Sequence, residues 1–178
     1  MTQWKKLALL TGIAVIVGTI TTGVVHAHWL GYDSVDGCEI RWEDETKYDS
    51  ARIAAQDAWE ALKGDDDCVD LEPDAWHTVA DLEWRDVDLS NVDWVGQYDA
   101  GPGADHINLN VHYMDQSDWT ACGDENVTMH ELGHALGLAH WNTTVQVMRR
   151  FIHPGPGGFT CALGNHDISD YEHLWGAS

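Results

Sequence analysis

Basic residues are scarce in this chain. Of its 178 residues only 9 are Lys or Arg, against 30 Asp or Glu, which gives a formal net charge of −21 at pH 7. All of the acidic residues lie after Ala27, so the part of the chain after Ala27 holds 30 acidic against seven basic residues, a net charge of −23. Such a surface repels a phosphate backbone, and we expect no nucleic-acid partner. The acidity also fits adaptation to high salt.

Cysteine is scarce as well, and no CxxC pair occurs, which excludes a thiolate zinc knuckle. Four cysteines predict two disulfides, for which three pairings exist, if the chain is exported as its N-terminal apolar run indicates below. Cys38 and Cys68 precede short apolar runs on either side of a candidate helix, and Cys122 and Cys161 lie before and after the motif described below. These positions favour Cys38 with Cys68 and Cys122 with Cys161.

Only one long apolar run is present. It covers 19 residues, Leu7 to Val25, follows two lysines and ends in Val25-His26-Ala27. This pattern predicts a signal peptide over residues 1–27, cleavage after Ala27 and a secreted product without stable membrane association. The alternative is a retained membrane anchor, since 19 residues just span a bilayer. Three interspersed glycines weaken such a span and favour cleavage.

The sequence after the predicted signal contains no internal repeat, low-complexity tract or domain linker. The 151 residues from His28 to Ser178 suffice for one domain with its own core, which we expect to be monomeric. Only a short stretch separates His28 from Cys38, too little for a folded propeptide. We therefore expect no latency segment within this domain.

Strand and helix signals occur together and predict the α+β class. Alanines at helical intervals mark one helix, which Gly64 ends, and a second apolar helix surrounds the motif below. Short β-branched or aromatic runs bounded by Asp, Asn and Pro mark the strands. The expected helices are Asp49–Lys63 and Asp124–Leu136, and the expected strands are Cys38–Trp42, Val69–Leu71, Thr78–Trp84, Val92–Tyr98 and Asp105–Val111.

One motif, HELGHALGLAH, begins at His130. Residues four apart lie on one face of a helix, so His130 and His134 can bind one metal ion while Glu131 leans over its open side. Gly137 readily takes the left-handed conformation that ends a helix, which lets His140 return to the ion. Three neutral imidazoles leave a fourth position for water.

The chemistry that this motif predicts is hydrolysis. Zinc with three protein ligands lowers the pKa of its bound water to roughly 7, and Glu131 is placed to take the proton as the water attacks a carbonyl. An HExxH match alone can arise by chance on a buried helix. The added Gly137 and His140 favour a single catalytic zinc ion.

The pattern HExxHxxGxxH followed by a methionine resembles the signature of the metzincin metallopeptidases. Met148, in Val147-Met148-Arg149, follows His140 by eight residues and looks like the Met-turn that runs beneath the metal in that family. That methionine is a packing residue and not a ligand. The resemblance implies an endopeptidase that acts on proteins or peptides.

Two further segments resemble the matrixin branch of this group. Asp105–Asn110 looks like the edge strand along which that branch binds its substrate, and Asp167–Gly176 resembles its closing helix. The resemblance covers Cys38–Gly176. It implies a small, mixed, twisted sheet with an antiparallel edge strand, an active-site helix, a Met-turn and a C-terminal helix.

The sequence also departs from the matrixin pattern. The animal matrixins carry a propeptide cysteine and a second, structural zinc site, and neither pattern is evident here. His77, His106 and His112 lack the ordered His/Asp spacing of that site, so we interpret them as surface or core histidines. Arg149-Arg150 replaces the common Tyr-Pro after the methionine, so the shape of the neighbouring specificity pocket does not carry over.

These observations predict a secreted zinc endopeptidase with Glu131 as general base and His130, His134 and His140 as ligands. The alternative is a non-catalytic, zinc-stabilised extracellular binding module. An intact Glu131 argues against it, because structural zinc usually has four protein ligands and needs no base. The acidic run Asp65–Asp67 is a candidate calcium site.

Overall fold

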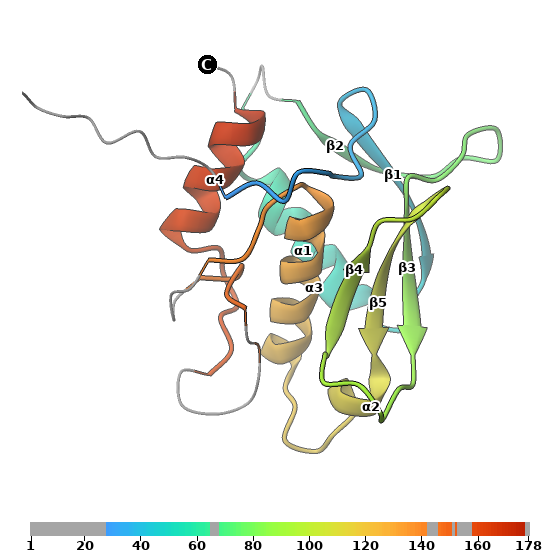
Figure 1. The fold of residues 1–178 in the computed structure, drawn as a ribbon, viewed down its shortest axis with the longest axis vertical. Helices are drawn as coiled ribbons and strands as arrows, with labels where there is room; N and C mark the ends of the chain where they lie inside the picture. Colours follow the sequence, from blue (N-terminus) through green and yellow to red (C-terminus); the bar gives the residue numbers. More distant parts are fainter. Residues whose placement is uncertain (1–27, 65–67, 142–145, 151, 153–157, 177–178) are drawn as a thin grey trace, which may run out of the picture.

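The computed structural model describes residues 28–64, 68–141, 146–150, 152 and 158–176. A sheet of five strands is covered by helices, which confirms the α+β prediction (Figure 1). The strands are β1 (Glu39–Glu45), β2 (Asp70–Pro73), β3 (Leu82–Val87), β4 (Gly96–Asp99) and β5 (Asp105–Asn110). The helices are α1 (Asp49–Glu60), α2 (Val111–Met114), α3 (Ala121–Ala135) and α4 (Asn165–Trp175).

Two segments that the sequence singled out lie outside the described residues. They are the predicted signal peptide, residues 1–27, and the candidate calcium run, residues 65–67. Within the described part of the chain, no helix combines the length and apolar character needed to cross a bilayer.

The sheet has the order β2-β1-β3-β5-β4. β1 pairs in parallel with β2 and β3, and β3 pairs in parallel with β5, whereas β4 runs antiparallel to β5. An antiparallel edge strand is therefore present, but the prediction that Asp105–Asn110 forms it is wrong. That segment is β5, which lies between two strands with Ile107 and Leu109 fully buried. The edge strand is β4.

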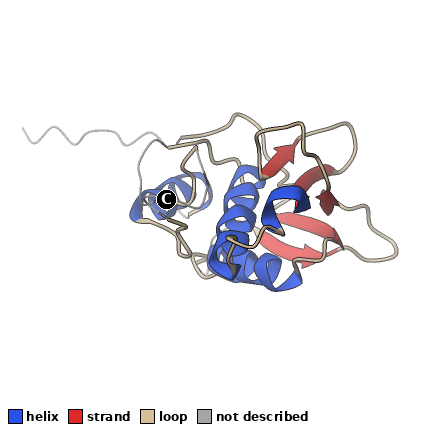
Figure 2. Cartoon of the chain, turned by 90° about the horizontal axis from the view of Figure 1, so that it is seen from below, coloured by secondary structure: helices blue, strands red, loops and turns tan. Residues whose placement is uncertain are grey.

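The two longest helices, α1 and α3, pack against each other on one face of the sheet, and α4 lies beyond α3 (Figures 1 and 2). The core between helices and sheet is apolar, and the indole of Trp59 from α1 donates a hydrogen bond to the Met129 carbonyl of α3 over 3.0 Å. The sheet side of this core includes Ile40, Leu82, Trp84, Ile107 and Leu109, all fully buried. α3 is thus held firmly between the sheet and α1.

The helix and strand boundaries differ from the predicted ones where side chains redirect the backbone. α3 begins at Ala121, before the expected Asp124, because the Thr120 hydroxyl accepts a hydrogen bond from the Gly123 amide and caps the helix. β3 begins at Leu82 and not at the expected Thr78. The Thr78 hydroxyl accepts a hydrogen bond from the Ala75 amide and closes a turn there.

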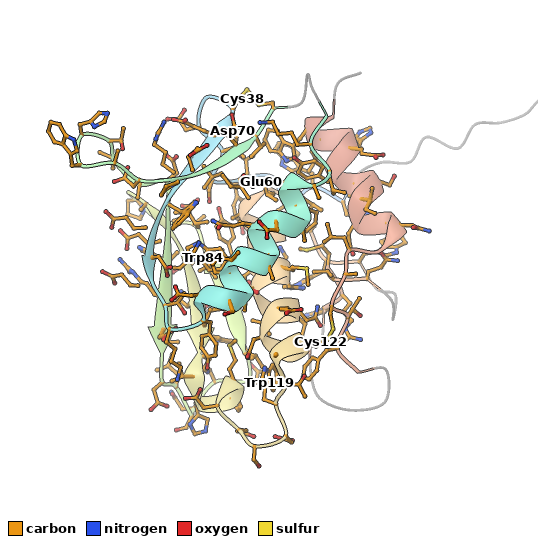
Figure 3. The ribbon with its side chains drawn as sticks, turned by 180° about the vertical axis from the view of Figure 1, so that it is seen from behind. Cys38, Glu60, Asp70, Trp84, Trp119 and Cys122 are labelled. Atoms are coloured by element: carbon orange, nitrogen blue, oxygen red, sulfur yellow. A yellow bond between two sulfur atoms is a disulfide. The ribbon has the colours of Figure 1, made fainter. Side chains whose placement is uncertain are left out.

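Both favoured disulfide pairings are confirmed. Cys38–Cys68 links the residue before β1 to the segment that enters β2, and Cys122–Cys161 links the first turn of α3 to the loop before α4. Cys38 lies at the top of Figure 3, and Cys122 lies well below it on the other side of α1. The two bridges therefore restrain different parts of the chain.

The N-terminal segment of the described chain packs beside the loop that follows α3. The Leu30 amide donates to the Gly137 carbonyl over 2.7 Å, and the Ser34 amide donates to the Ala135 carbonyl over 2.8 Å. The Ala139 amide donates in turn to the His28 carbonyl. This pairing positions the loop that leads to His140.

Candidate metal centre and active site

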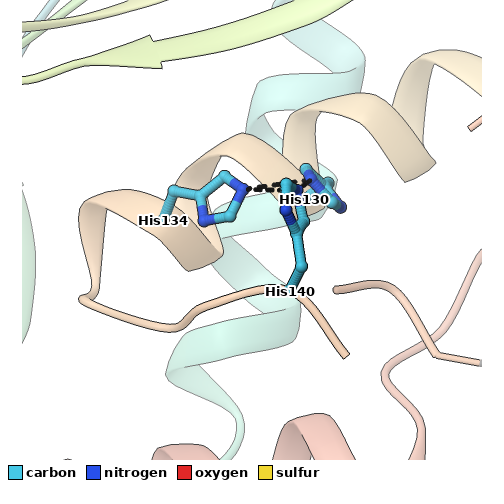
Figure 4. A group of neighbouring side chains, drawn as sticks. All are labelled: His130, His134 and His140. Atoms are coloured by element: carbon cyan, nitrogen blue, oxygen red, sulfur yellow. Dashed lines mark hydrogen bonds between the residues drawn. The ribbon is translucent and has the colours of Figure 1, made fainter. Parts of the chain in front are cut away.

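Three histidines from α3 and the following loop converge on one point (Figure 4). His130 and His134 stand one turn apart on α3, and their Nε2 atoms are 3.1 Å apart. His140 Nε2 lies 3.1 Å from each of these atoms. The chain reverses at Gly137, whose φ of +86° suits glycine and brings His140 back toward the helix. The structure thus brings the three predicted ligands together.

The protonation of two of these rings follows from their second nitrogens. His130 Nδ1 lies 2.7 Å from the Val147 carbonyl oxygen, and His134 Nδ1 lies 2.7 Å from the Leu138 carbonyl oxygen. A carbonyl can only accept, so each Nδ1 carries the hydrogen and each Nε2 of the neutral ring presents a lone pair. Lone pairs that face one another at 3.1 Å fit a shared cation.

The environment also keeps the three rings neutral. Burial lowers the pKa of His130 well below its ordinary value and lowers the pKa of His134 to about 4. Burial lowers the pKa of His140 as well, with a smaller contribution from the charge of Arg150. Neutral imidazoles are the form that binds metal. The donor set therefore fits a divalent zinc ion with three histidine ligands.

Glu131 lies beside the three histidines and is only 4 % exposed. Its Oε2 accepts a hydrogen bond of 2.8 Å from the Tyr98 amide of β4. Burial raises the pKa of this carboxyl to about 8, and the hydrogen bond from Tyr98 opposes the rise. A cation held by the neighbouring histidines would act in the same direction as this hydrogen bond and lower the pKa of Glu131. The edge strand thus orients the carboxylate that the sequence singled out.

Gly96 allows β4 to approach α3 closely enough for this contact. A Cβ at Gly96 would lie 2.6 Å from Val127 Cγ1 and 2.7 Å from Glu131 Oε1, closer than van der Waals contact permits. Only a residue without a side chain fits between the edge strand and the helix.

A cavity of about 280 Å³ opens beside Glu131 and His140. It is lined by Asp93, Trp94, Val95, Gly96, Glu131, His140, Arg150 and Ile152. A larger hollow of about 710 Å³ lies between the N-terminal segment and β1 and holds none of the four predicted site residues. The chemistry of the lining, and not the volume, therefore marks the smaller cavity as the candidate active site.

The predicted Met-turn lies against α3. Met148 is 2 % exposed, and a Cβ at Gly133 would collide with its sulfur. Asp167, the third residue of α4, binds the backbone of this turn. Its Oδ2 accepts a hydrogen bond from the Val147 amide over 2.7 Å, and its Oδ1 accepts one from the Met148 amide over 3.1 Å. The Val147 carbonyl accepts a hydrogen bond from His130 Nδ1. By holding the Val147 backbone, Asp167 therefore positions His130, a candidate metal ligand.

Sequence reasoning missed this role of Asp167. Its Oδ2 also accepts from the Gly164 amide over 2.8 Å, which caps the start of α4. An acidic residue three positions after Gly164, before an apolar helix face, was the available signal for the cap. The contact with the Met-turn has no local signal, because 20 positions separate Asp167 from Val147.

Replacing Asp167 with Asn is expected to lower the free energy of unfolding by about 2 to 4 kcal/mol. The amide nitrogen of Asn cannot accept, so at least one buried backbone amide loses its partner. Urea denaturation measures the change, and Glu172→Gln, exposed on the same helix, serves as the control. Equal stability of the Asp167 and Glu172 variants would contradict the role assigned to Asp167.

The structure also places the other histidines. His77 is exposed, and within the described ranges neither it nor His106 or His112 joins a group of three potential metal ligands. A second group of potential ligands does occur, formed by His28, His166 and Asp170, which sequence reasoning did not anticipate.

This chain is similar to known metalloproteinases over part of its length. Matrix metalloproteinase-25 from Mus musculus is 36% identical over 84 residues, which cover 42% of this chain and 14% of that protein. Macrophage metalloelastase from Rattus norvegicus is 34% identical over 84 residues, which cover 43% of this chain and 17% of that protein. The aligned part thus spans less than a fifth of either relative. The family model of the matrixins matches residues 26–176, and the chain belongs to the matrixin family.

Proposed function

We propose that this protein is a zinc-dependent endopeptidase, with His130, His134 and His140 as zinc ligands and Glu131 as general base. The convergence of three neutral imidazoles beside a buried carboxylate, at the wall of a cavity, carries this proposal. Membership of the matrixin family supports it independently.

A zinc ion held by these three histidines would supply Lewis-acid chemistry, which would polarise the scissile carbonyl and make water more acidic. Glu131 takes one proton from the attacking water and passes it to the nitrogen of the scissile peptide bond, which leaves as an amine. Tyr98 holds the carboxylate in place through its backbone amide. His130 and His134 keep their orientation through the carbonyls of Val147 and Leu138.

The edge strand β4 is the proposed binding surface for an extended peptide. Among the described strands β4 pairs only with β5, and residues 93–96 before and at its start line the cavity beside Glu131. An extended peptide can add to such an edge through backbone hydrogen bonds. This assigns to β4 the role that the sequence resemblance gave to Asp105–Asn110.

Incubation of the purified protein with a broad peptide library tests the proposed activity. Cleavage that stops with a metal chelator and returns on addition of Zn²⁺ is the expected result. If the protein binds zinc at the three histidines but cuts no peptide, the non-catalytic binding module takes the place of the endopeptidase.

We also propose that the protein is exported and processed after Ala27. The lysine-flanked apolar run and the Val25-His26-Ala27 ending support this proposal. N-terminal sequencing of the protein from the culture medium is expected to start at His28. A cell-bound product that retains Met1 would instead make the segment a membrane anchor.

A further inference from the structure

A second cluster of potential ligands lies where the N-terminal segment meets α4, and it shares no residue with the three histidines of the candidate active site. His28 Nδ1 is 3.3 Å from Asp170 Oδ2, and His166 Nδ1 is 3.0 Å from the same oxygen. The three donor atoms lie within 4.8 Å of one another. Figure 1 shows the start of the described chain passing beside α4, so two distant segments form this cluster.

The cluster contains buried polar atoms that the described protein leaves unsatisfied. The side chain of Asp170 is only 3 % exposed, and its Oδ1 has no hydrogen-bond partner among the described residues. His166 Nδ1 also lacks a hydrogen bond there, because its short contact with Asp170 does not have hydrogen-bond geometry. A buried carboxylate oxygen without a partner is costly. A cation held between the two imidazoles and this carboxylate would give His166 Nδ1 a partner and would offset the cost of burying the Asp170 charge.

Trp141 holds the two imidazoles in place. Its ring stacks on His166 with centroids 4.3 Å apart and packs against His28 with centroids 4.0 Å apart. The Trp141 amide donates to the Met148 carbonyl over 2.7 Å, which fixes the backbone that carries the indole. Ligand rings that are oriented before binding lower the cost of holding a metal ion.

We propose that His28 Nδ1, His166 Nδ1 and the Asp170 carboxylate bind one divalent transition-metal ion, with Zn²⁺ as the fitting choice. Two imidazoles and a carboxylate form a donor set that suits zinc, whereas Ca²⁺ and Mg²⁺ prefer oxygen ligands alone. The site shares no residue with the proposed catalytic centre.

An ion at this second site would fasten the N-terminal segment to α4. In the same segment, the His28 carbonyl accepts from the Ala139 amide and the Leu30 amide donates to the Gly137 carbonyl. Gly137 and Ala139 belong to the loop that leads to His140. The second ion would thus stabilise the loop that carries the third proposed catalytic ligand. All three ligands lie outside the cavity beside Glu131, so the second ion would act on the stability of this loop and not on the groups that line the cavity.

Metal counting on the untagged, processed protein tests the second site. After saturation with Zn²⁺ and removal of excess metal, we expect two zinc ions per parent chain, measured by inductively coupled plasma mass spectrometry. His166→Phe keeps a ring against Trp141 but removes the ligand, and we expect it to hold one ion. The control His173→Phe, at an exposed position on α4, is expected to keep two.

The His134→Ala background separates the second site from the proposed catalytic one. That variant is expected to keep one zinc ion, and its melting temperature is expected to rise when Zn²⁺ is added. The double variant His134→Ala/His166→Phe is expected to hold no zinc and to show no such rise. One ion in the parent and none in His134→Ala would overturn the proposal, as would two ions in His166→Phe. Two ions in a parent that cuts no peptide would leave the second site standing while removing the proposed activity.

Discussion

Replacing Glu131 with Gln is expected to lower kcat by about 100-fold or more, while the zinc content stays that of the parent. The amide keeps the size of the side chain and can still accept the hydrogen bond from Tyr98, which leaves the approach of β4 intact. It cannot take a proton from water at neutral pH. Steady-state kinetics on a fluorogenic peptide, with metal analysis of the same sample, measures both quantities.

Glu125→Gln provides the matched control for this experiment. Glu125 lies on the same helix as Glu131 but outside the residues that line the cavity. We expect this variant to cleave at the parent rate. A Glu131→Gln variant that retains the parent rate would remove the proposed base, and one that loses zinc would show that the carboxylate acts on metal binding instead.

The residues of the zinc motif were predictable because their geometry is local. His130 and His134 meet through the helical repeat, and Gly137 allows the short reversal that returns His140 within three residues. The position of each side chain follows from backbone conformation over eleven residues. No distant segment has to be known to place them near one another.

The edge strand could not be predicted in the same way. An alternating pattern indicates that one face of a strand is buried, but it does not tell which strands lie on either side. Asp105–Asn110 alternates clearly and is nevertheless flanked by β3 and β4. β4 is only four residues long and starts with Gly96, so its own pattern is weak.

Contacts between distant segments account for the other residues that were missed. Asp167 acts through backbone amides of the Met-turn, and any residue type has such amides, so the sequence carries no mark of the partner. His28 and Asp170 are separated by 142 positions and meet only because the N-terminal segment lies beside α4. Only the assembled fold brings these side chains together.

Replacing His134 with Ala is expected to remove the zinc ion of the proposed catalytic centre and to lower kcat/KM by about 1000-fold or more. Two imidazoles remain, and a site that loses one of three protein ligands loses both affinity and geometry. Losing the several kcal/mol of transition-state stabilisation that a zinc ion supplies accounts for a decrease of that size.

The comparison variant for His134→Ala is His173→Ala, because His173 is exposed on α4 and belongs to neither group of potential ligands. It is expected to keep the metal content and the rate of the parent. The measurements are zinc per chain and cleavage of the fluorogenic peptide with excess Zn²⁺ present. If His134→Ala cleaved at the parent rate under these conditions, the three histidines would not form the catalytic centre, and the proposed endopeptidase mechanism would have to be abandoned.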